Sequence, residues 1–456
     1  MKKSLVSVAL TFVVVLATHP CARAAEGKPE ALAEAFVDLL AKEDFTAAVA
    51  RFDTTMLAAL PEPKLRDTWQ SLTNQVGPFK QRLRSKALKV GAYDVVLVTS
   101  EFGQTKLDVK VAFNGKGEVS GLFFVPSAGE AEQAGPPPYA NTNAFRERPF
   151  TVGSGEWSLP GTLTVPLSKR TSAVFPAVIL VHGSGPNDRD ETVGMIKLFR
   201  DLAWGLATKG IAVLRYEKRT REHGAKLMKE ANARFTLREE TIDDGAQAAE
   251  QLRQAEAIDS GRIFVLGHSL GGLAAPRIAQ ANTNIAGLVI MAGATRPLED
   301  LMVEQTRYIL SLKGNMSPAD QKKLRQVESE ATAIKKLTAA DESSATLLFG
   351  APAAYWLDLR AHDPAAEAKL LKQPLLIMQG GRDYQVTQAD FSNWKTALVG
   401  QSNVTFKLYT NLNHLFVSGK GQSSPQEYQQ PGHVTEAVVD DIATWIKRVG
   451  ITHKTD

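Results

Sequence analysis

Hydrophobic and polar positions follow three successive patterns along this chain. From Glu30 to Val76 the apolar residues recur at helical spacing, which predicts several helices. From Tyr93 onward the period changes to two. Strands are therefore predicted over 93–99, 106–113 and 119–125. Asn114-Gly115 marks a tight hairpin between the last two strands. Helices followed by an antiparallel sheet predict a small α+β domain over residues 25–126.

The third pattern begins at Phe150, where short continuous apolar runs alternate with amphipathic helical stretches. Such runs are typical of strands that are covered on both faces, so they predict a doubly wound, mostly parallel α/β sheet. Two short strands are expected to flank residues 159–163. The later strands are predicted at 177–181, 211–216, 262–266, 285–291, 374–378 and 404–408, with helices at 194–209, 236–257, 273–281, 388–398 and 433–448.

Two segments do not fit a simple alternation of strands and helices. Residues 296–365 carry a Leu- and Ala-rich helical pattern that is far longer than one crossover helix requires, which predicts an inserted helical cap. Residues 127–145 are rich in Ala, Gly and Pro, which favours an interdomain linker. The second domain is therefore expected to span residues 146–456.

The first residues are typical of a secretory signal peptide. Lys2 and Lys3 precede a short, mostly apolar run, and the small-x-small site ends at Ala24. We expect cleavage after Ala24 and a secreted or periplasmic mature protein. Cys21, the single cysteine, lies in this leader, so a disulfide framework and a thiolate metal site are excluded.

Composition and charge narrow the function classes. The 456 residues are 44% hydrophobic and 22% charged, which excludes a disordered protein. A net charge of +4 gives little reason to expect a nucleic-acid partner. No later run is long and apolar enough to span a membrane, and no histidine pair has metal-ligand spacing. We expect no metal and no other cofactor.

The candidate nucleophile is Ser269, in the only Gly-x-Ser-x-Gly sequence of the chain, Gly267-His268-Ser269-Leu270-Gly271. The motif follows a predicted strand and precedes a predicted helix. Glycines at both ends allow the sharp turn that exposes a nucleophilic serine. The sequence therefore predicts an activated serine at this turn.

A serine nucleophile requires a base and an acid that orients the base. In this arrangement they follow the serine in the order acid, then histidine. His414, just after the last predicted strand, is the expected base, with His433 as the alternative. Asp383, on the loop after the strand at 374–378, is the expected acid, with Asp390 in reserve.

An oxyanion also requires backbone N–H donors. We expect one from Leu270, directly after the nucleophile, and one from Ser184 in the loop after the strand at 177–181. Gly183, Gly185 and His268 are further candidates for substrate contact. His182 is expected to pack beneath the loop.

Residues 150–450 resemble the α/β-hydrolase fold. The run from His182 to Asp190, together with the run from Leu214 to Arg219, is similar to a family of bacterial carboxylesterases that often carry an extra N-terminal domain. Thr220 stands where such relatives commonly have Gly. The order of elements in the N-terminal domain resembles nuclear transport factor 2-like domains.

The resemblance implies a carboxylesterase that acts on small acyl esters. Peptidase, thioesterase and acyltransferase activities use the same machinery and remain alternatives, as does an inactive binding protein. Pairing of two chains into a homodimer stays open. Asp188 to Asp190 are expected to form a salt-bridged loop, and Lys218 to Arg221 a solvated one.

Overall fold

The computed structural model describes residues 28–90, 93–103, 105–127, 135–170, 172–230, 234–344 and 346–452. The predicted signal peptide lies outside these residues. The chain divides after Ala131 into two compact units. Within the described part of the chain, none of the helices combines the length and the apolar character that crossing a membrane requires.

The N-terminal unit has helices on one face of an antiparallel sheet, as the sequence predicts. Its helices are α1 (Pro29–Ala41), α2 (Phe45–Val49), α3 (Thr54–Ala59) and α4 (Glu62–Val76). Its strands, in spatial order, are β1 (Phe79–Val90), β2 (Tyr93–Phe102), β3 (Lys106–Phe113) and β4 (Val119–Pro126). Phe36, Trp69 and Phe102 lie at the centre of the core between the two layers.

Strand β1 was not predicted, because polar Gln81 and Ser85 stand between its few apolar residues and two register shifts, at Phe79/Gln81 and Arg82/Arg84, break the regular pairing of the strand. Two of its polar side chains find partners on α1: Arg82 Nε donates to Asp38 Oδ1 at 2.7 Å, and Ser85 bonds to Glu34. The predicted hairpin at Asn114 is present. Its left-handed residue, however, is Gly117 and not Gly115.

The second unit contains an eight-stranded sheet in the order β16-β15-β12-β11-β7-β10-β6-β5. Strand β6 is antiparallel to both neighbours, and the other pairs are parallel. The strands are β5 (Phe145–Val152), β6 (Leu159–Pro166), β7 (Phe175–Val181), β10 (Ala212–Tyr216), β11 (Ile258–His268), β12 (Gly287–Met291), β15 (Leu375–Gly380) and β16 (Val404–Tyr409). The predicted α/β sheet is confirmed.

One strand assignment was wrong. Residues 159–163 were expected to separate two strands, but they lie inside β6, where Leu163 pairs with Leu214 and Thr162 with Arg215. Gly161 at this position lets β10 approach closely, because a Cβ would lie 2.7 Å from the Arg215 carbonyl oxygen. Residues 159–163 are therefore part of a strand, and Gly161 allows its close contact with β10.

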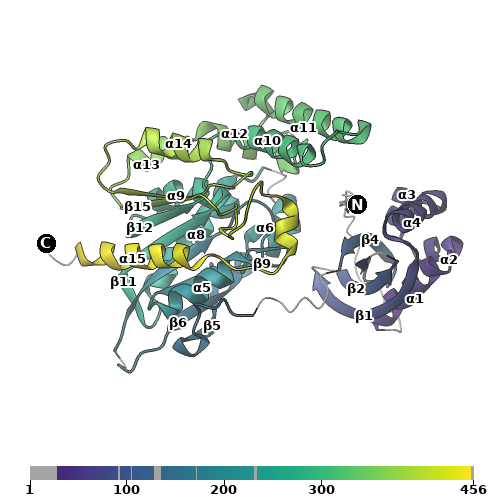
Figure 1. Ribbon diagram of the computed structural model, residues 1–456, viewed down its shortest axis with the longest axis horizontal. Coiled ribbons are helices and arrows are strands. Elements are labelled where there is room, and N and C mark those ends of the chain that lie inside the picture. Colours follow the sequence, from purple (N-terminus) through teal and green to yellow (C-terminus); the bar gives the residue numbers. More distant parts are fainter. Residues whose placement is uncertain are drawn as a thin grey trace. The chain divides into compact units, whose positions relative to one another are not determined.

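Helices cover both faces of this sheet (Figure 1). Helices α5 (Leu198–Thr208) and α15 (Glu436–Thr452) lie on one face. The opposite face is covered by α8 (Asp243–Arg253), α9 (Leu270–Ala281) and α14 (Gln388–Ala397). Alternate residues of β7 belong to the two cores: Val178 and Leu180 pack toward α5 and α15, Ile179 toward α8 and α9. This double burial explains the continuous apolar runs.

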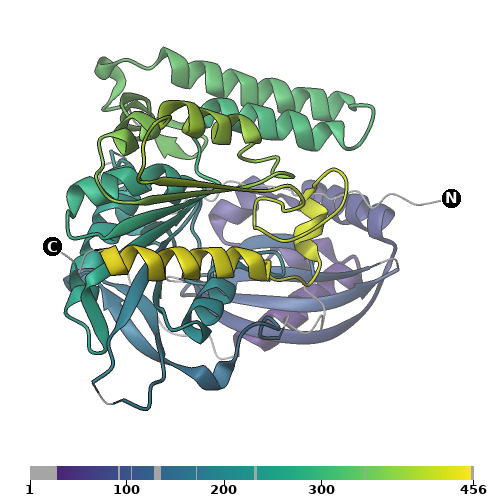
Figure 2. The ribbon, with the colours of Figure 1, turned by 60° about the vertical axis from the view of Figure 1, so that its left-hand side comes forward.

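The cap is inserted between β12 and β15. It consists of α10 (Leu298–Ser311), α11 (Pro318–Lys336), the short hairpin β13 (Leu347–Leu348) and β14 (Ala351–Pro352), α12 (Ala353–Ala361) and α13 (Pro364–Lys369). Helices α10 and α11 lie side by side above the sheet (Figure 2). Leu301, Ile334 and Trp356 of the cap join the same core as α9.

Candidate active site

Ser269 occupies the sharp turn between β11 and α9. Its backbone adopts φ 54° and ψ −114°, a left-handed conformation that is costly for any residue but glycine. Both flanking glycines are required by close contact: a Cβ on Gly267 would lie 2.1 Å from the Gly271 carbonyl oxygen, and one on Gly271 equally near that of Val181. The turn therefore has the geometry that the motif predicts, with the serine at the N-terminus of α9.

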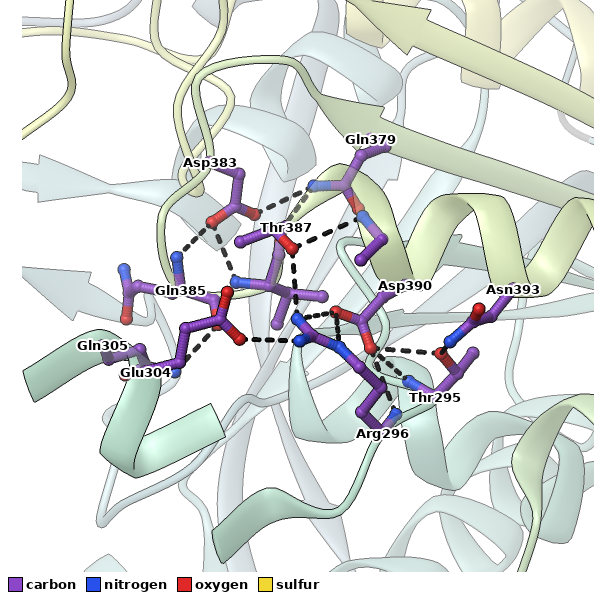
Figure 3. A network of polar contacts seen from close by, with 12 residues as sticks. Thr295, Arg296, Glu304, Gln305, Gln379, Asp383, Gln385, Thr387, Asp390 and Asn393 are labelled. Carbon is purple, nitrogen blue, oxygen red and sulfur yellow. Dashed lines mark hydrogen bonds and ion pairs between the residues drawn. The ribbon is translucent and has the colours of Figure 1, made fainter. Parts of the chain in front are cut away.

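The structure brings His414 and Asp383 together. His414 Nδ1 lies 2.7 Å from Asp383 Oδ2, and both side chains are buried. The backbone N–H groups of Gln385 and Val386 donate to the other carboxylate oxygen at 2.8 and 3.0 Å. Gln379 Nε2 donates to Oδ2 at 3.1 Å (Figure 3). The carboxylate is thus fixed, and it fixes the imidazole ring.

The reserve acid, Asp390, has a different task. Its carboxylate accepts the backbone N–H groups of Thr295 and Arg296, at 2.9 and 3.1 Å, and pairs with the Arg296 guanidinium (Figure 3). Arg296 also bonds to Glu304 on α10. Asp390 therefore anchors the segment that leads into the cap, and it does not contact His414.

The alternative base is also engaged elsewhere. His433 Nδ1 lies 2.9 Å from Asp201 Oδ2 on α5, on the far side of the sheet from α9. His414 sits on a loop that its neighbour Asn413 shapes, because the Asn413 side chain accepts the N–H groups of Leu415 and Val417. Of the two histidines, His414 is the one that lines the same cavity as Ser269.

Two backbone donors lie at the cavity that Ser269 lines. Within the part of the chain that the structure describes, the N–H groups of Ser184 and Leu270 have no acceptor. The Gly183 N–H, by contrast, donates to Glu191 Oε1 at 2.6 Å. A Cβ on Gly183 would lie 3.2 Å from Ser269 Cβ, so this loop runs directly beside the nucleophile.

His268 is buried and bonded through both ring nitrogens. Nδ1 lies 3.1 Å from Glu191 Oε1, and Nε2 lies 3.0 Å from the backbone oxygen of His414. Burial disfavours the imidazolium, but the Glu191 charge and these hydrogen bonds outweigh it, so the pKa of His268 is raised. Burial likewise opposes ionisation of Glu191, yet the His268 charge lowers the pKa of that carboxyl. The pair joins the Ser184 loop, the nucleophile turn and the His414 loop.

His182 packs beneath the Ser184 loop, as expected from the sequence. Its ring lies against Phe199 and Tyr216, and Nε2 lies 3.1 Å from the Asp188 backbone oxygen. Burial lowers the pKa of His182 to about 4. The ring is therefore neutral near neutral pH, and its packing supports the Ser184 loop.

The expected salt-bridged loop after this segment is present. Arg189 Nε donates to Glu217 at 2.7 Å, and Asp190 bonds to Arg215. The prediction for Lys218 to Arg221 was wrong in its first half. Lys218 is 2% exposed and Arg219 pairs with the buried Asp244, because acidic partners from residues 240–244 cover them.

A cavity of about 610 Å³ opens over Ser269, between the sheet and the cap. Ser184, Gly183, Gly185, His268, Leu270 and His414 all line it. The remaining wall is mainly apolar, with Leu227 and Leu273 from the helices that flank the sheet and Leu301, Met302 and Trp356 from the cap. Among the described residues, no group of three His, Cys, Asp or Glu side chains is placed to hold a metal ion.

Four residues of this site were not assigned a role from the sequence: Glu191, Gln379, Glu240 and Tyr355. Gln379 bonds locally, to Asp383 and to the Val386 oxygen. Each of the other three has a partner far along the chain, such as Tyr355 on Glu240. A local sequence pattern carries no signal for such pairs. Glu191 has one local mark, a left-handed backbone with φ 46°, which is visible only in the structure.

The sheet order, the strand–serine–helix turn and the inserted cap define an α/β-hydrolase. Residues 174–421 match the family described as serine aminopeptidase, S33, and residues 33–122 match a family of unknown function, DUF3887. The chain is 38% identical over 411 residues to esterase EstD of Thermotoga maritima. The aligned residues cover 90% of this chain and 93% of that protein. The chain therefore belongs to the family of esterase EstD and is a carboxylesterase-type serine hydrolase.

Solved structures show more distant likeness. An esterase of Pyrococcus furiosus aligns with 68% of this chain and 91% of its own, at 16% identity and a TM-score of 0.41. Pyrococcus horikoshii acylaminoacyl peptidase aligns with 81% of this chain and 51% of its own, at 14% identity and a TM-score of 0.42.

Proposed function

We propose that Ser269, His414 and Asp383 form the catalytic triad of this esterase. The observation that carries the proposal is the 2.7 Å bond between His414 Nδ1 and Asp383 Oδ2, at the cavity that Ser269 also lines. An acid on Nδ1 fixes the tautomer in which Nε2 accepts a proton. Asp383 is in turn held by three donors from its own loop and strand.

The reaction then has two halves. In the first, His414 takes the hydroxyl proton as Ser269 Oγ bonds to the ester carbonyl carbon. The alcohol leaves with that proton, and an acyl-enzyme remains. In the second half His414 activates a water, which attacks the acyl carbon and regenerates the serine. The N–H groups of Ser184 and Leu270 hold the negative oxygen in both tetrahedral intermediates.

The preferred substrates are esters of small, uncharged acyl groups. The cavity wall is mainly apolar, and its two carboxylates are already engaged. Glu191 Oε1 bonds to His268 and Gly183, and its Oε2 is buried with no hydrogen-bond partner among the described residues; Glu240 bonds to Lys218 and Tyr355. An aminopeptidase needs an accessible carboxylate for the substrate's ammonium group, and each of these two already has a basic partner, His268 or Lys218.

The test compares kcat/KM for p-nitrophenyl esters, aminoacyl anilides and acyl thioesters. We expect esters of neutral acids to be preferred, and Ser269→Ala to lose activity by about 10⁴-fold or more and to lose fluorophosphonate labelling. Ser168→Ala, at an exposed loop position, is the matched control. Undiminished hydrolysis by Ser269→Ala would refute the triad, and a preference for anilides would replace esterase activity by peptidase activity.

We also propose that the mature protein acts outside the cytoplasm. The basic, apolar and small-x-small succession before Ala25 supports this. Fractionation of an expressing bacterium, with N-terminal sequencing of the purified protein, tests it. A mature chain starting at Ala25 in the periplasm or medium is the expected result, and a full-length cytoplasmic chain contradicts it.

A further inference from the structure

The peptide between Gly183 and Ser184 has a cation on its carbonyl side. Lys218 Nζ donates to the Gly183 oxygen at 2.8 Å, and Asn187 Nδ2 donates to the same oxygen at 3.1 Å. No described residue has a cis peptide bond. In a trans peptide the C=O and the following N–H point in opposite directions. The group that Lys218 holds therefore sets the direction of the Ser184 N–H.

Lys218 is placed for this contact by long-range partners. It follows β10 at the start of α6 (Arg219–Glu222), and only 2% of the residue is exposed. Its other partner is Glu240 Oε1 at 2.9 Å, on the π-helical segment Arg238–Ile242 that precedes α8. Burying an ammonium group is costly unless it is paired, so the lysine is held in this one position.

The same chain of contacts reaches the cap. Tyr355 Oη, on α12, donates to Glu240 Oε2 at 2.7 Å. Both Tyr355 and Glu240 line the cavity above Ser269. A continuous series of hydrogen bonds thus runs from the cap through Glu240 and Lys218 to the peptide that carries the Ser184 N–H.

We propose that Lys218 is a positioning residue of the oxyanion hole, which aims and polarises the Gly183–Ser184 peptide. A cation on the carbonyl oxygen withdraws electron density from the amide, and the N–H becomes a stronger donor to a developing oxyanion. Fixed donors of this kind act mainly on the transition state, because the charge they stabilise develops there. The inference rests on the triad and oxyanion hole proposed above.

The experiment uses the full chain, four new variants and the Ser269→Ala variant described above. Lys218→Met keeps the length of the side chain without its charge, and Lys218→Met with Glu240→Gln avoids an unpaired buried carboxylate. Asn187→Ala removes the second donor to the Gly183 oxygen, together with the Asn187 bond to the Ser184 oxygen, at a half-buried loop position. Lys407→Met, at a surface ion pair with Asp441, is the matched lysine control.

The measurements are kcat and KM for p-nitrophenyl butyrate, Ki for a butyl trifluoromethyl ketone and Kd for butyrate. The ketone forms a tetrahedral oxyanion on the serine, whereas butyrate tests ground-state binding. We expect the double variant to lose about 10- to 100-fold in kcat, with KM within about threefold. The ketone's affinity should fall by the same factor as kcat/KM, and that for butyrate should not change. Asn187→Ala should also lower kcat and the affinity for the ketone without changing the affinity for butyrate, but by smaller factors.

Two results would overturn the inference. One is wild-type kcat and ketone affinity in the double variant and in Asn187→Ala. The other is an equal loss of ketone and butyrate affinity, which marks a purely structural role. Circular dichroism and the thermal midpoint establish folding. Should the buried variants unfold, Asn187→Ala decides. Ser269→Ala distinguishes a failure of the proposed triad from a failure of the role proposed for Lys218. If Ser269→Ala stays active, the triad is wrong. If it is inactive, only the role of Lys218 is in question.

Discussion

His268 Nε2 lies 3.0 Å from the backbone oxygen of His414, while its Nδ1 lies 3.1 Å from Glu191 Oε1. His268, the residue before the nucleophile, therefore connects the His414 loop, through Glu191, to the Ser184 loop. Because a carbonyl and a carboxylate both accept, this geometry favours donation from both nitrogens of His268, and the raised pKa of the ring opposite Glu191 favours its imidazolium form. Its contribution to stability must then depend on pH.

The His268–Glu191 pair predicts how the stability of the protein changes with pH. The raised pKa of His268 gives stability that is complete below the unfolded value of about 6.5 and is lost as pH rises through the folded value. The lowered pKa of Glu191 gives stability that is complete above about 4.3 and is lost as pH falls through the folded value. The wild type's advantage over His268→Gln/Glu191→Gln should therefore be greatest between about pH 4.3 and 6.5.

Denaturant unfolding of the wild type and the double variant across pH measures this difference. Near neutral pH, His268→Gln alone should cost about 3–5 kcal/mol, because it leaves a buried carboxylate unpaired. The double variant should cost less than that single variant. A pH-independent difference between the wild type and the double variant would show that the pair is not ionised.

Asp383 and Asp390 form a matched pair of aspartates for a test of roles. Asp383→Asn should lower kcat by about 10³- to 10⁴-fold with little change in stability, because an amide cannot orient the required His414 tautomer. Asp390→Asn should leave kcat within about threefold but destabilise the protein by about 3 kcal/mol, since Arg296 loses its buried partner. Steady-state kinetics and thermal unfolding of both variants measure these effects. A large loss of kcat in Asp390→Asn, with a loss of stability alone in Asp383→Asn, would contradict the assignment.

Gly183→Ala tests the close approach of the Ser184 loop to the nucleophile. The new Cβ would lie 2.9 Å from Glu191 Oε1 and 3.2 Å from Ser269 Cβ, so the loop must shift away from the serine. A displacement of this kind should cost about 10²-fold in kcat/KM. Gly115→Ala, which meets no atom within 4 Å, is the control. Full activity in Gly183→Ala would show that the loop is not set by this contact.

The cap residue Met302 offers a test of acyl-chain selection. It lines the cavity, and Met302→Trp would fill part of the apolar volume. We expect kcat/KM for p-nitrophenyl octanoate to fall about tenfold relative to p-nitrophenyl acetate, because overpacking costs about 1–3 kcal/mol. Equal losses for both esters would indicate that the acyl chain lies elsewhere.

The hydrolase unit should act without the N-terminal unit, since every candidate site residue lies after Ala131. The starting residue matters. Tyr139 Oη donates to the Val434 oxygen at 2.8 Å, and its ring packs against the core below α5. A chain that begins at Glu132 should therefore keep esterase activity and a higher thermal midpoint than one that begins at Ala144. Loss of fluorophosphonate labelling in the folded longer chain would contradict this.

Features that depend on the local order of residues could be predicted from the sequence alone. Five of the six predicted apolar runs form strands that are buried on both faces, whereas the run at 404–408 forms the partly exposed edge strand β16. The Gly-x-Ser-x-Gly turn could be recognised from its own five residues, although Gly271 is also required by its close contact with Val181. The sequence also limited the acid and the base to a few candidates, in the order that the fold requires.

Only the tertiary structure decided which of these candidates meet. Asp383 and His414 are joined, whereas Asp390 holds Arg296 and His433 holds Asp201. Lys218 was expected to be solvated because it lies in a basic stretch, but in the structure it is buried and paired with Glu240. Burial and pairing of a charged side chain depend on partners that folding brings from elsewhere in the chain. A local pattern cannot contain that information.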